Sequence, residues 1–437
     1  MLLQGVLPIS PTPTSTFSFA TLSEIAPVLS GFGWLLVVFL LMWVVWNTYL
    51  LLKRIDYFSA IEWVFLEISI PPDSEETPKS MESFFEIMGG IHKSPDLIEK
   101  YFDGYIEAWI SCEILCLPGQ ARYFIIAPAA YRQLVEASIY AQYPRAEVVE
   151  AEDYTQRYTW RDIREKIDIF GTEVIQTNEE YYPIKTYLEF ETPLAEEDKY
   201  VDPHQIVIET LTNISPGEEF WIQMCVRPTD AKEINAWAAK GQQEIAVISG
   251  QAKKAAPGVL SGLKDQAMQF PGELLSAAFN GPIEAERKKD EQTLRFFNPV
   301  DEARMKGILQ KTSHTGFRTK IRIMHIAPAG QLKKPNIARA FGVFKQFNTF
   351  HLNGLKPDKA TKSNGPNAIM RDKRRYLRER KIFLQFQWRE LWYGDGAMYT
   401  AEELATIYHF PSKHVKTPGL TRAKSGLQSP PKNLPYA

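Results

Sequence analysis

The chain has 437 residues, of which 45% are hydrophobic and 23% are charged, and its formal net charge at pH 7 is -2. This composition is ordinary for globular protein, and the near-zero charge alone gives no indication of a polyanionic partner. The three cysteines, Cys112, Cys116 and Cys225, contain no C-x-x-C pair, which argues against a zinc ribbon or a disulfide framework and favours a reducing compartment.

The N-terminal part of the sequence predicts a membrane anchor. No charged residue occurs from Ala26 to Leu52, and about 20 apolar residues are enough for a helix to cross the hydrocarbon layer. A cleaved signal peptide would begin with basic residues, but the first 23 residues contain no Lys or Arg. Lys53 and Arg54 follow the run, so we expect a single span over 26–54 in the cytoplasmic membrane. Residues 1–25 would then lie outside the cytoplasm and the bulk of the chain inside it; a buried soluble helix is the alternative.

Residues 55–155 predict the order strand, helix, strand, strand, helix, strand. Cys112 and Ile114 alternate with Ser111 and Glu113 along one of these strands, and a Pro-Gly turn leads into the next. This order is that of a ferredoxin-like, or βαββαβ, module.

A second copy of the pattern is predicted over 181–358, after a linker over 156–180. The dipeptide Trp-Ile opens a strand at Trp109 and again at Trp221, and Ile-Ala-Pro ends a strand at Pro128 and again at Pro328. An internal duplication is therefore predicted, with the first strand of the second copy over 182–190, its last strand beginning at Phe350, and a mainly helical insertion over 229–315. The expected fold is α+β: an N-terminal transmembrane helix and two ferredoxin-like modules.

A basic run lies within residues 359–411, which we expect to form a basic segment and a capped C-terminal helix. It could contact nucleic-acid phosphates, be a solvated helix face, or bind anionic lipid headgroups. An apolar, strand-like stretch follows over 382–392. The basic residues of the run are Arg371, Lys373, Arg374, Arg375, Arg378, Arg380 and Lys381.

The residues from Thr400 to Glu403 have capping-box spacing and predict a short helix that ends before Pro411. His409 and His414 lie on either side of that proline and are expected to be ordinary surface side chains. The remaining sequence, 412–437, is a proline-rich tail of linker composition.

Motifs that would indicate catalysis are missing from the sequence. It contains no Walker A loop, no H-E-x-x-H and no G-x-S-x-G. Nicking enzymes built on a ferredoxin-like sheet need a pair of strand histidines, whereas His325 stands alone between Met324 and Ile326. We therefore expect no catalytic residue, no metal site and no cofactor.

Three stretches resemble a known family: residues 139–148 with Asp153-Tyr154 behind them, residues 399–411, and the Pro-Pro-Lys-Asn-Leu-Pro sequence at 430–435. Together they resemble the membrane-anchored N-terminal region of coupling-protein-like ATPases, which serve type IV secretion or conjugative DNA transfer in uncultured small-genome bacteria. In fused relatives the last stretch leads into the motor domain. This sequence stops at Ala437, so the resemblance implies a motor on a separate chain or a truncated copy.

These observations predict a non-enzymatic, single-pass membrane subunit that docks a DNA-translocating P-loop ATPase. The rival is a membrane-tethered nucleic-acid adaptor that uses the basic run together with Arg318, Lys320 and Arg322. DNA and a second copy of the chain are further candidate partners. The expected contacts with the motor are the proline-rich tail and six residues of the capped helix: Thr400, Glu403, Leu404, Tyr408, His409 and Phe410.

Overall fold

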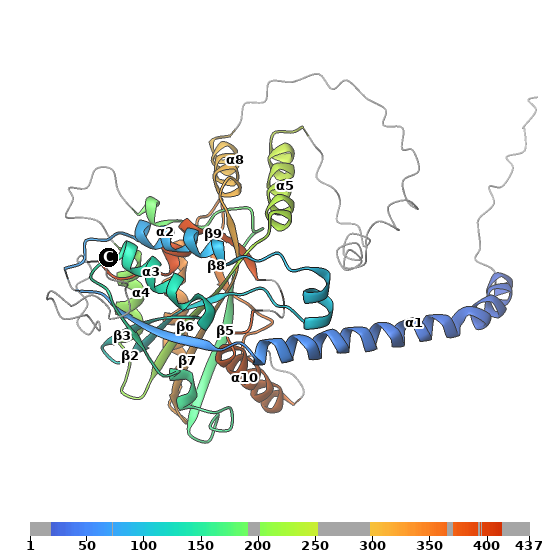
Figure 1. Ribbon diagram of the computed structural model, residues 1–437, viewed down its shortest axis with the longest axis horizontal. Coiled ribbons are helices and arrows are strands. Elements are labelled where there is room, and N and C mark those ends of the chain that lie inside the picture. The colour runs from blue at the N-terminus through green and yellow to red at the C-terminus, as the bar shows by residue number, and fades with distance from the viewer. Residues whose placement is uncertain are drawn as a thin grey trace, which may run out of the picture. The chain divides into compact units, whose positions relative to one another are not determined.

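The computed structural model describes residues 19–71, 73–190, 202–251, 298–364, 370–391, 394 and 396–412. Contacts divide the chain into two compact units, whose helices and strands are labelled in Figure 1. One unit is Met1–Ile61 with Pro95–Ile106, and the other is Glu62–Ser94 with Glu107–Ala437. The predicted N-terminal segment lies mostly outside the described residues, as do residues 252–297 of the insertion and the tail beyond Ser412.

The first unit contains the helix α1 (Phe19–Ser59) and a short π-helix, η2 (Glu99–Asp103). Within α1, the stretch Val37–Ser59 is long and apolar enough to cross a membrane, and none of it is buried. The large apolar side chains from Val37 to Trp46 are all exposed. The structure therefore has one candidate membrane-spanning helix among the described residues, and it overlaps the anchor predicted over 26–54.

The second unit is built on one antiparallel sheet of nine strands. Its order is β4-β1-β3-β2-β6-β7-β5-β8, and β9 pairs with β7 beside this path. The strands are β1 (Trp63–Ser69), β2 (Ile110–Leu117), β3 (Gln120–Pro128), β4 (Glu147–Glu150), β5 (Ile167–Gln176), β6 (Glu219–Pro228), β7 (Gly316–Pro328), β8 (Leu355–Pro357) and β9 (Ala397–Thr400). The two halves of the sheet join where β2 pairs with β6, from Ile110 opposite Val226 to Cys116 opposite Phe220.

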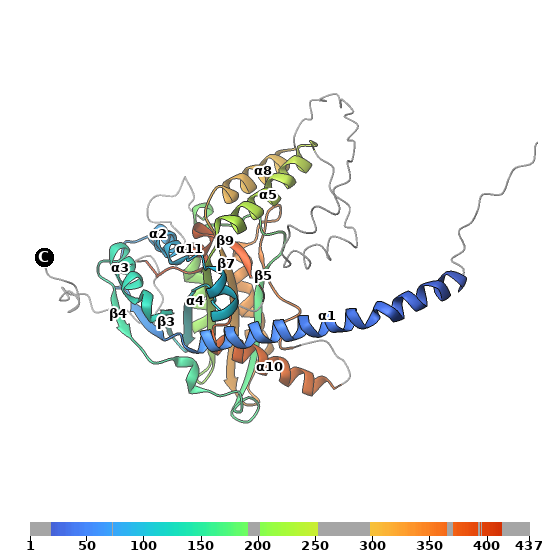
Figure 2. The same cartoon turned by 45° about the vertical axis from the view of Figure 1, so that its right-hand side comes forward.

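Helices cover both faces of this sheet (Figure 2). One face carries α2 (Pro78–Met88), α3 (Arg132–Gln142), α4 (Pro203–Thr212), α9 (Lys334–Gly342), α11 (Ala401–Ile407) and the 3-10 turn η7 (Val343–Phe347). The other face carries α10 (Arg371–Gln387) and the η4 turn (Tyr154–Arg157). The helices α5 (Ala231–Ile248) and α8 (Pro299–Thr312) pair with each other and bury Trp237 and Ile308 beside Met398 of β9.

Alternation along the strands sorts side chains between these two cores. Cys112 and Ile114 of β2 face the larger core, beside Phe84 of α2 and Leu404 of α11. Leu115 faces the smaller core, where Phe386 of α10 packs. The α+β class, the order of strands and helices along the chain within residues 63–150 and the alternation along β2 are confirmed.

The opening strand of the second half is not where the sequence predicts it. It is β5 (Ile167–Gln176), inside the expected linker, because Ile167, Ile169 and Val174 pair with β7 and bury their side chains. The expected strand over 182–190 is loop and the η5 turn (Tyr187–Glu189). Pro183 lies within that stretch and cannot donate a ladder hydrogen bond.

Two further strand predictions are wrong. The apolar stretch from Ile382 to Gln387 continues α10, because Ile382, Phe383 and Phe386 recur at helical spacing toward the smaller core. The closing strand β8 is Leu355–Pro357 rather than a strand that begins at Phe350, whose side chain is fully exposed.

Candidate functional site

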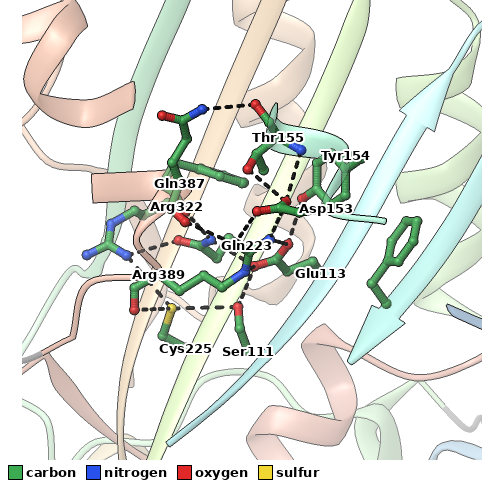
Figure 3. Close-up of polar contacts among 12 residues, drawn as sticks. Ser111, Glu113, Asp153, Tyr154, Thr155, Gln223, Cys225, Arg322, Gln387 and Arg389 are labelled. Carbon is green, nitrogen blue, oxygen red and sulfur yellow. Dashed lines mark hydrogen bonds and ion pairs between the residues drawn. The ribbon is translucent and has the colours of Figure 1, made fainter. Parts of the chain in front are cut away.

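A buried polar network lies at the seam between the two halves of the sheet, on the face that carries α10 (Figure 3). Glu113 of β2 and Gln223 of β6 are register partners in the middle of the seam, and Gln223 Nε2 donates to Glu113 Oε1 at 2.8 Å. Ser111 Oγ donates to the same oxygen at 2.6 Å, and Tyr154 Oη donates to Oε2 at 2.8 Å. A carboxylate at the centre of the sheet is thus surrounded by three neutral donors.

Arg389 provides the charge that balances this carboxylate. It follows α10 with a φ of 51°, in the left-handed region. Its Nε lies 3.0 Å from Glu113 Oε1, and its Nη2 donates to Glu113 Oε2 at 3.2 Å and to Asp153 Oδ1 at 3.0 Å. Burial alone would lower the pKa of Arg389, but the charges of Glu113 and Asp153 raise it above its usual value. The guanidinium is therefore held charged in the interior.

Arg322 of β7 extends the network to the second half of the sheet. It is completely buried, and its Nη1 donates to Gln223 Oε1 at 3.0 Å. Its Nε donates to Glu173 Oε1 of β5 at 3.2 Å, and its Nη2 donates to the carbonyl of Glu390. Glu113, Gln223, Arg322 and Glu173 thus form one row across β2, β6, β7 and β5. We call Glu113, Asp153, Gln223, Arg322 and Arg389 the seam network.

The chemistry of the seam network indicates a structural role, as a clamp that holds strands of the sheet together. Each of its charged side chains has an oppositely charged partner within 3.3 Å. The neighbouring thiol of Cys225 is no nucleophile at neutral pH, because burial raises its pKa to about 11. The described residues contain no group of three or more His, Cys, Asp or Glu side chains that could hold a metal ion. The arrangement fixes β2, β6, β7 and the end of α10 to one another.

The backbone of Arg389 reinforces this clamp. Its carbonyl accepts hydrogen bonds from Trp109 Nε1 at 3.0 Å and from Cys225 Sγ at 3.5 Å. The guanidinium also lies over the ring of Phe65, with 4.7 Å to the centroid. One residue thereby contacts β1, β2, β6 and the η4 turn.

The basic run of α10 divides into two groups. Arg371, Lys373, Arg374 and Lys381 are exposed. Arg375 is half-buried and donates to Glu379 at 2.6 Å, and Arg378 donates to the carbonyl of Lys362 at 3.3 Å. Arg380 lies over the ring of Trp160, with 4.1 Å to the centroid. Arg378 and Arg380 therefore attach α10 to neighbouring segments and Arg375 pairs within the helix, so a contact with phosphates would fall mainly to the start of the helix.

The six residues expected to dock a motor are buried in this chain's own core. Thr400 and Glu403 form the predicted capping box, and Glu403 Oε2 also lies 3.0 Å from Nζ of the buried Lys311. Tyr408 Oη donates to the carbonyl of Phe124 at 3.0 Å. The docking prediction for these side chains is therefore not supported, because none of them reaches the surface. Their exposed fractions are 4% for Thr400, 1% for Glu403, 0% for Leu404, 1% for Tyr408, 1% for His409 and 2% for Phe410.

His409 belongs to a buried histidine pair that the sequence analysis missed. Its Nε2 lies 2.8 Å from Asp202 Oδ1, and the centroid of its ring lies 4.7 Å from the centroid of the His204 ring. Burial lowers the pKa of His204 to about 3, and the charge of His409 contributes to this effect. The prediction of a surface side chain is wrong for His409, while His414 lies outside the described residues. Sequence spacing gives no signal here, because Asp202 and His409 are 207 positions apart.

An open cleft of about 720 Å³ lies where the chain leaves β5, beside α5 and α8. Its lining includes the acidic residues Glu179 and Glu244, the aromatic residue Tyr182 and the basic residue Arg304. Tyr182 Oη donates to Glu244 Oε1 at 3.1 Å. Tyr182 and Glu244 thus satisfy each other, and Arg304 Nε donates to the carbonyl of His351 at 3.1 Å.

Comparison with known protein families gives a match over most of the sheet. A family model described as "Domain of unknown function (DUF8128)" matches residues 109–423, which is well over half of the chain. It includes the whole seam network and both α10 and α11. No curated protein matches the sequence.

Proposed function

The chain belongs to the DUF8128 family of domains of unknown function, and on that premise we propose that it is a non-enzymatic, single-pass membrane subunit that positions a separately encoded, DNA-translocating P-loop ATPase. The observation that carries the proposal is the exposed apolar helix Val37–Ser59. An exposed apolar surface of this length is costly in water and favourable in a bilayer. The basic pair after Leu52 supports a cytoplasmic location for the sheet.

The sheet has the properties of a rigid support. Its two halves share seven register pairs between β2 and β6, and the seam network links them through buried charges. We further propose that the halves are two ferredoxin-like modules that arose by duplication. The orders β4-β1-β3-β2 and β8-β5-β7-β6 support this. When the strands are numbered within each half, both orders read fourth, first, third and second strand, which is the order of a ferredoxin-like sheet.

The motor is proposed as the partner because of the sequence resemblance described above. Since the six side chains predicted to dock the motor are buried, the contact is assigned to the proline-rich sequence after Ser412. A deletion that tests it must start at residue 413, because a deletion from Thr400 would also remove core residues such as Leu404 and Tyr408.

The direct experiment is crosslinking and affinity capture of the full chain from native membranes, followed by peptide identification. We expect peptides of one separate chain that contains a Walker A sequence, and we expect the variant that lacks residues 413–437 to lose them. Capture without any P-loop ATPase would refute the proposal. Capture that is insensitive to the deletion would refute the role of the tail.

A second candidate, a membrane-tethered nucleic-acid adaptor, is favoured by the start of α10. Arg371, Lys373 and Arg374 are exposed there, although cations at a helix N-terminus oppose the helix dipole. Lys320 and Arg322 no longer support this role, since they are 7% and 0% exposed, and Arg318 is paired with Glu180 at 2.7 Å. The variant R371E/K373E/R374E should lose salt-dependent DNA binding if this function holds; equal binding by variant and parent would refute it.

A further inference from the structure

One segment of the chain belongs structurally to the unit that contains α1, although in sequence it interrupts the unit that contains the sheet. Pro95–Ile106 lies between α2 and β2 along the chain, yet its contacts group it with Met1–Ile61. It contains η2 (Glu99–Asp103) and packs against the C-terminal part of α1.

Aromatic side chains form the contact between the segment and α1. The ring of Tyr101 lies 6.2 Å from that of Trp46, and the ring of Tyr105 lies 5.6 Å from that of Tyr57. Trp46, Lys53 and Tyr57 are seven and four residues apart, so they share one face of the helix. The segment therefore runs along α1 over about three turns.

Gly104 allows the backbone of the segment to approach the backbone of α1 closely. It ends η2 with a φ of 74°, and a Cβ added there would lie 2.4 Å from the carbonyl carbon of Lys53 and 2.5 Å from its oxygen. No side chain fits at that distance. The close approach therefore fixes the height of the segment along α1 at Lys53.

Lys53 is also the point at which charge first appears after the apolar run. With a rise of about 1.5 Å per residue, Trp46 lies about 10 Å before this level and Tyr57 about 6 Å beyond it. Trp and Tyr side chains collect at the same depth, where the hydrocarbon meets the headgroups. The segment thus lies at the level of a membrane interface if α1 spans the bilayer.

The segment exposes large apolar side chains at this level. Leu97 is 74% exposed, Ile98 is 63% exposed and Phe102 is 59% exposed. Such a concentration within 12 residues is unusual for a surface loop and is typical of a surface that contacts lipid or protein.

We propose that Pro95–Ile106 is a second, monotopic membrane contact, in which Leu97, Ile98 and Phe102 insert into the interface of the bilayer that α1 crosses. This rests on the proposed anchoring by α1. Asp96, Glu99 and Asp103 outnumber Lys100, so attraction to anionic lipid does not drive the contact. Burial of apolar surface drives it, and neutral phosphatidylcholine is sufficient. The contact fixes the rotation of α1 relative to the membrane plane.

The test uses the full chain in phosphatidylcholine vesicles, with one introduced cysteine that carries an environment-sensitive fluorophore. The native thiols are buried and do not interfere. Labels at I98C and F102C should show blue-shifted emission and stronger quenching by lipids with a nitroxide near the headgroup than by lipids with a deep nitroxide. A label at L41C reports the anchor and should be quenched by the deep nitroxide, while E302C on the exposed face of α8 should show neither effect.

The outcomes separate the two proposals. Deep quenching at position 41 with aqueous emission at 98 and 102 overturns the interfacial contact and leaves the anchor intact, whereas no quenching at 41 overturns both. Two glycine variants refine the test. G104A should reduce the quenching at position 98 at least twofold and leave position 41 unchanged. G119A is the matched control, since Gly119 has a similar φ of 68° but nothing within 4 Å of an added Cβ. Equal quenching in G104A and G119A would contradict the assigned docking.

Discussion

Replacement of Arg389 by Met tests the seam network. The change removes a guanidinium that is 3% exposed and leaves Glu113, which is 0% exposed, without its cation. Loss of one partner from a buried ion pair costs about 3–5 kcal/mol of unfolding free energy, because the remaining charge stays desolvated. Ser111, Tyr154 and Gln223 still donate to Glu113, so we expect the lower end, about 3 kcal/mol.

A surface pair provides the matched control. Arg132 donates to Glu136 at 2.8 Å, but its side chain is 38% exposed and water screens the pair. Arg132→Met should therefore cost less than about 1 kcal/mol. The double variant E113Q/R389M removes both central charges, so it should recover most of the loss seen in R389M.

Denaturant unfolding of the full chain in lipid nanodiscs measures these differences. Trp109 and Trp221 are buried beside the seam network, and their fluorescence reports its disruption. The reasoning is refuted if R389M is no less stable than R132M. It is also refuted if the double variant is less stable than R389M alone.

Three further predictions concern other parts of the fold. His204 has a pKa of about 3 when folded and about 6.5 when unfolded, so between these values the unfolded chain binds one proton more than the folded chain. The contribution of His204 to the free energy of unfolding is therefore full above pH 6.5 and should fall by about 3 kcal/mol between pH 6.5 and 4. Denaturation curves measured at each pH should show a smaller decrease for the H204F variant. Thr400→Ala removes the side-chain acceptor for the Glu403 amide and should cost about 1 kcal/mol, whereas Thr349→Ala, outside any helix cap, should cost less in the same assay. Gly171→Ala places a Cβ 2.9 Å from Ile382 and should cost about 1–3 kcal/mol, with the double variant G171A/I382V recovering part of that loss; no recovery would contradict this packing.

Local patterns predicted much of the fold. The alternation of Cys112 and Ile114 with Ser111 and Glu113 correctly separated the faces of β2, and the capping box correctly located the start of α11. These features depend on neighbours within a few residues. Predictions failed where a different segment decided the outcome. Residues 167–176 form a strand because β7 pairs with them, although Asp168 and Glu173 interrupt their apolar pattern.

The candidate site was less predictable because its partners are distant in sequence. The polar face of β2 is expected to meet solvent when only its alternation is known. In the structure, Arg389 covers it from 276 positions away. Likewise, the sequence of the capped helix contains several Glu and Thr residues, which are expected to be exposed to solvent. Lys311, 92 residues earlier, is the partner that buries Glu403.

The proposed function depends most directly on whether α1 is a retained membrane span with the sheet in the cytoplasm. Thiol labelling in intact cells with a membrane-impermeant reagent measures this for the full chain, with one cysteine introduced at Ser15 and, separately, one at Glu302. We predict that position 15 is labelled in intact cells and that position 302 is labelled only after the membrane is permeabilised. The reverse pattern, or a mature protein from which the N-terminal apolar segment has been cleaved, would contradict the account.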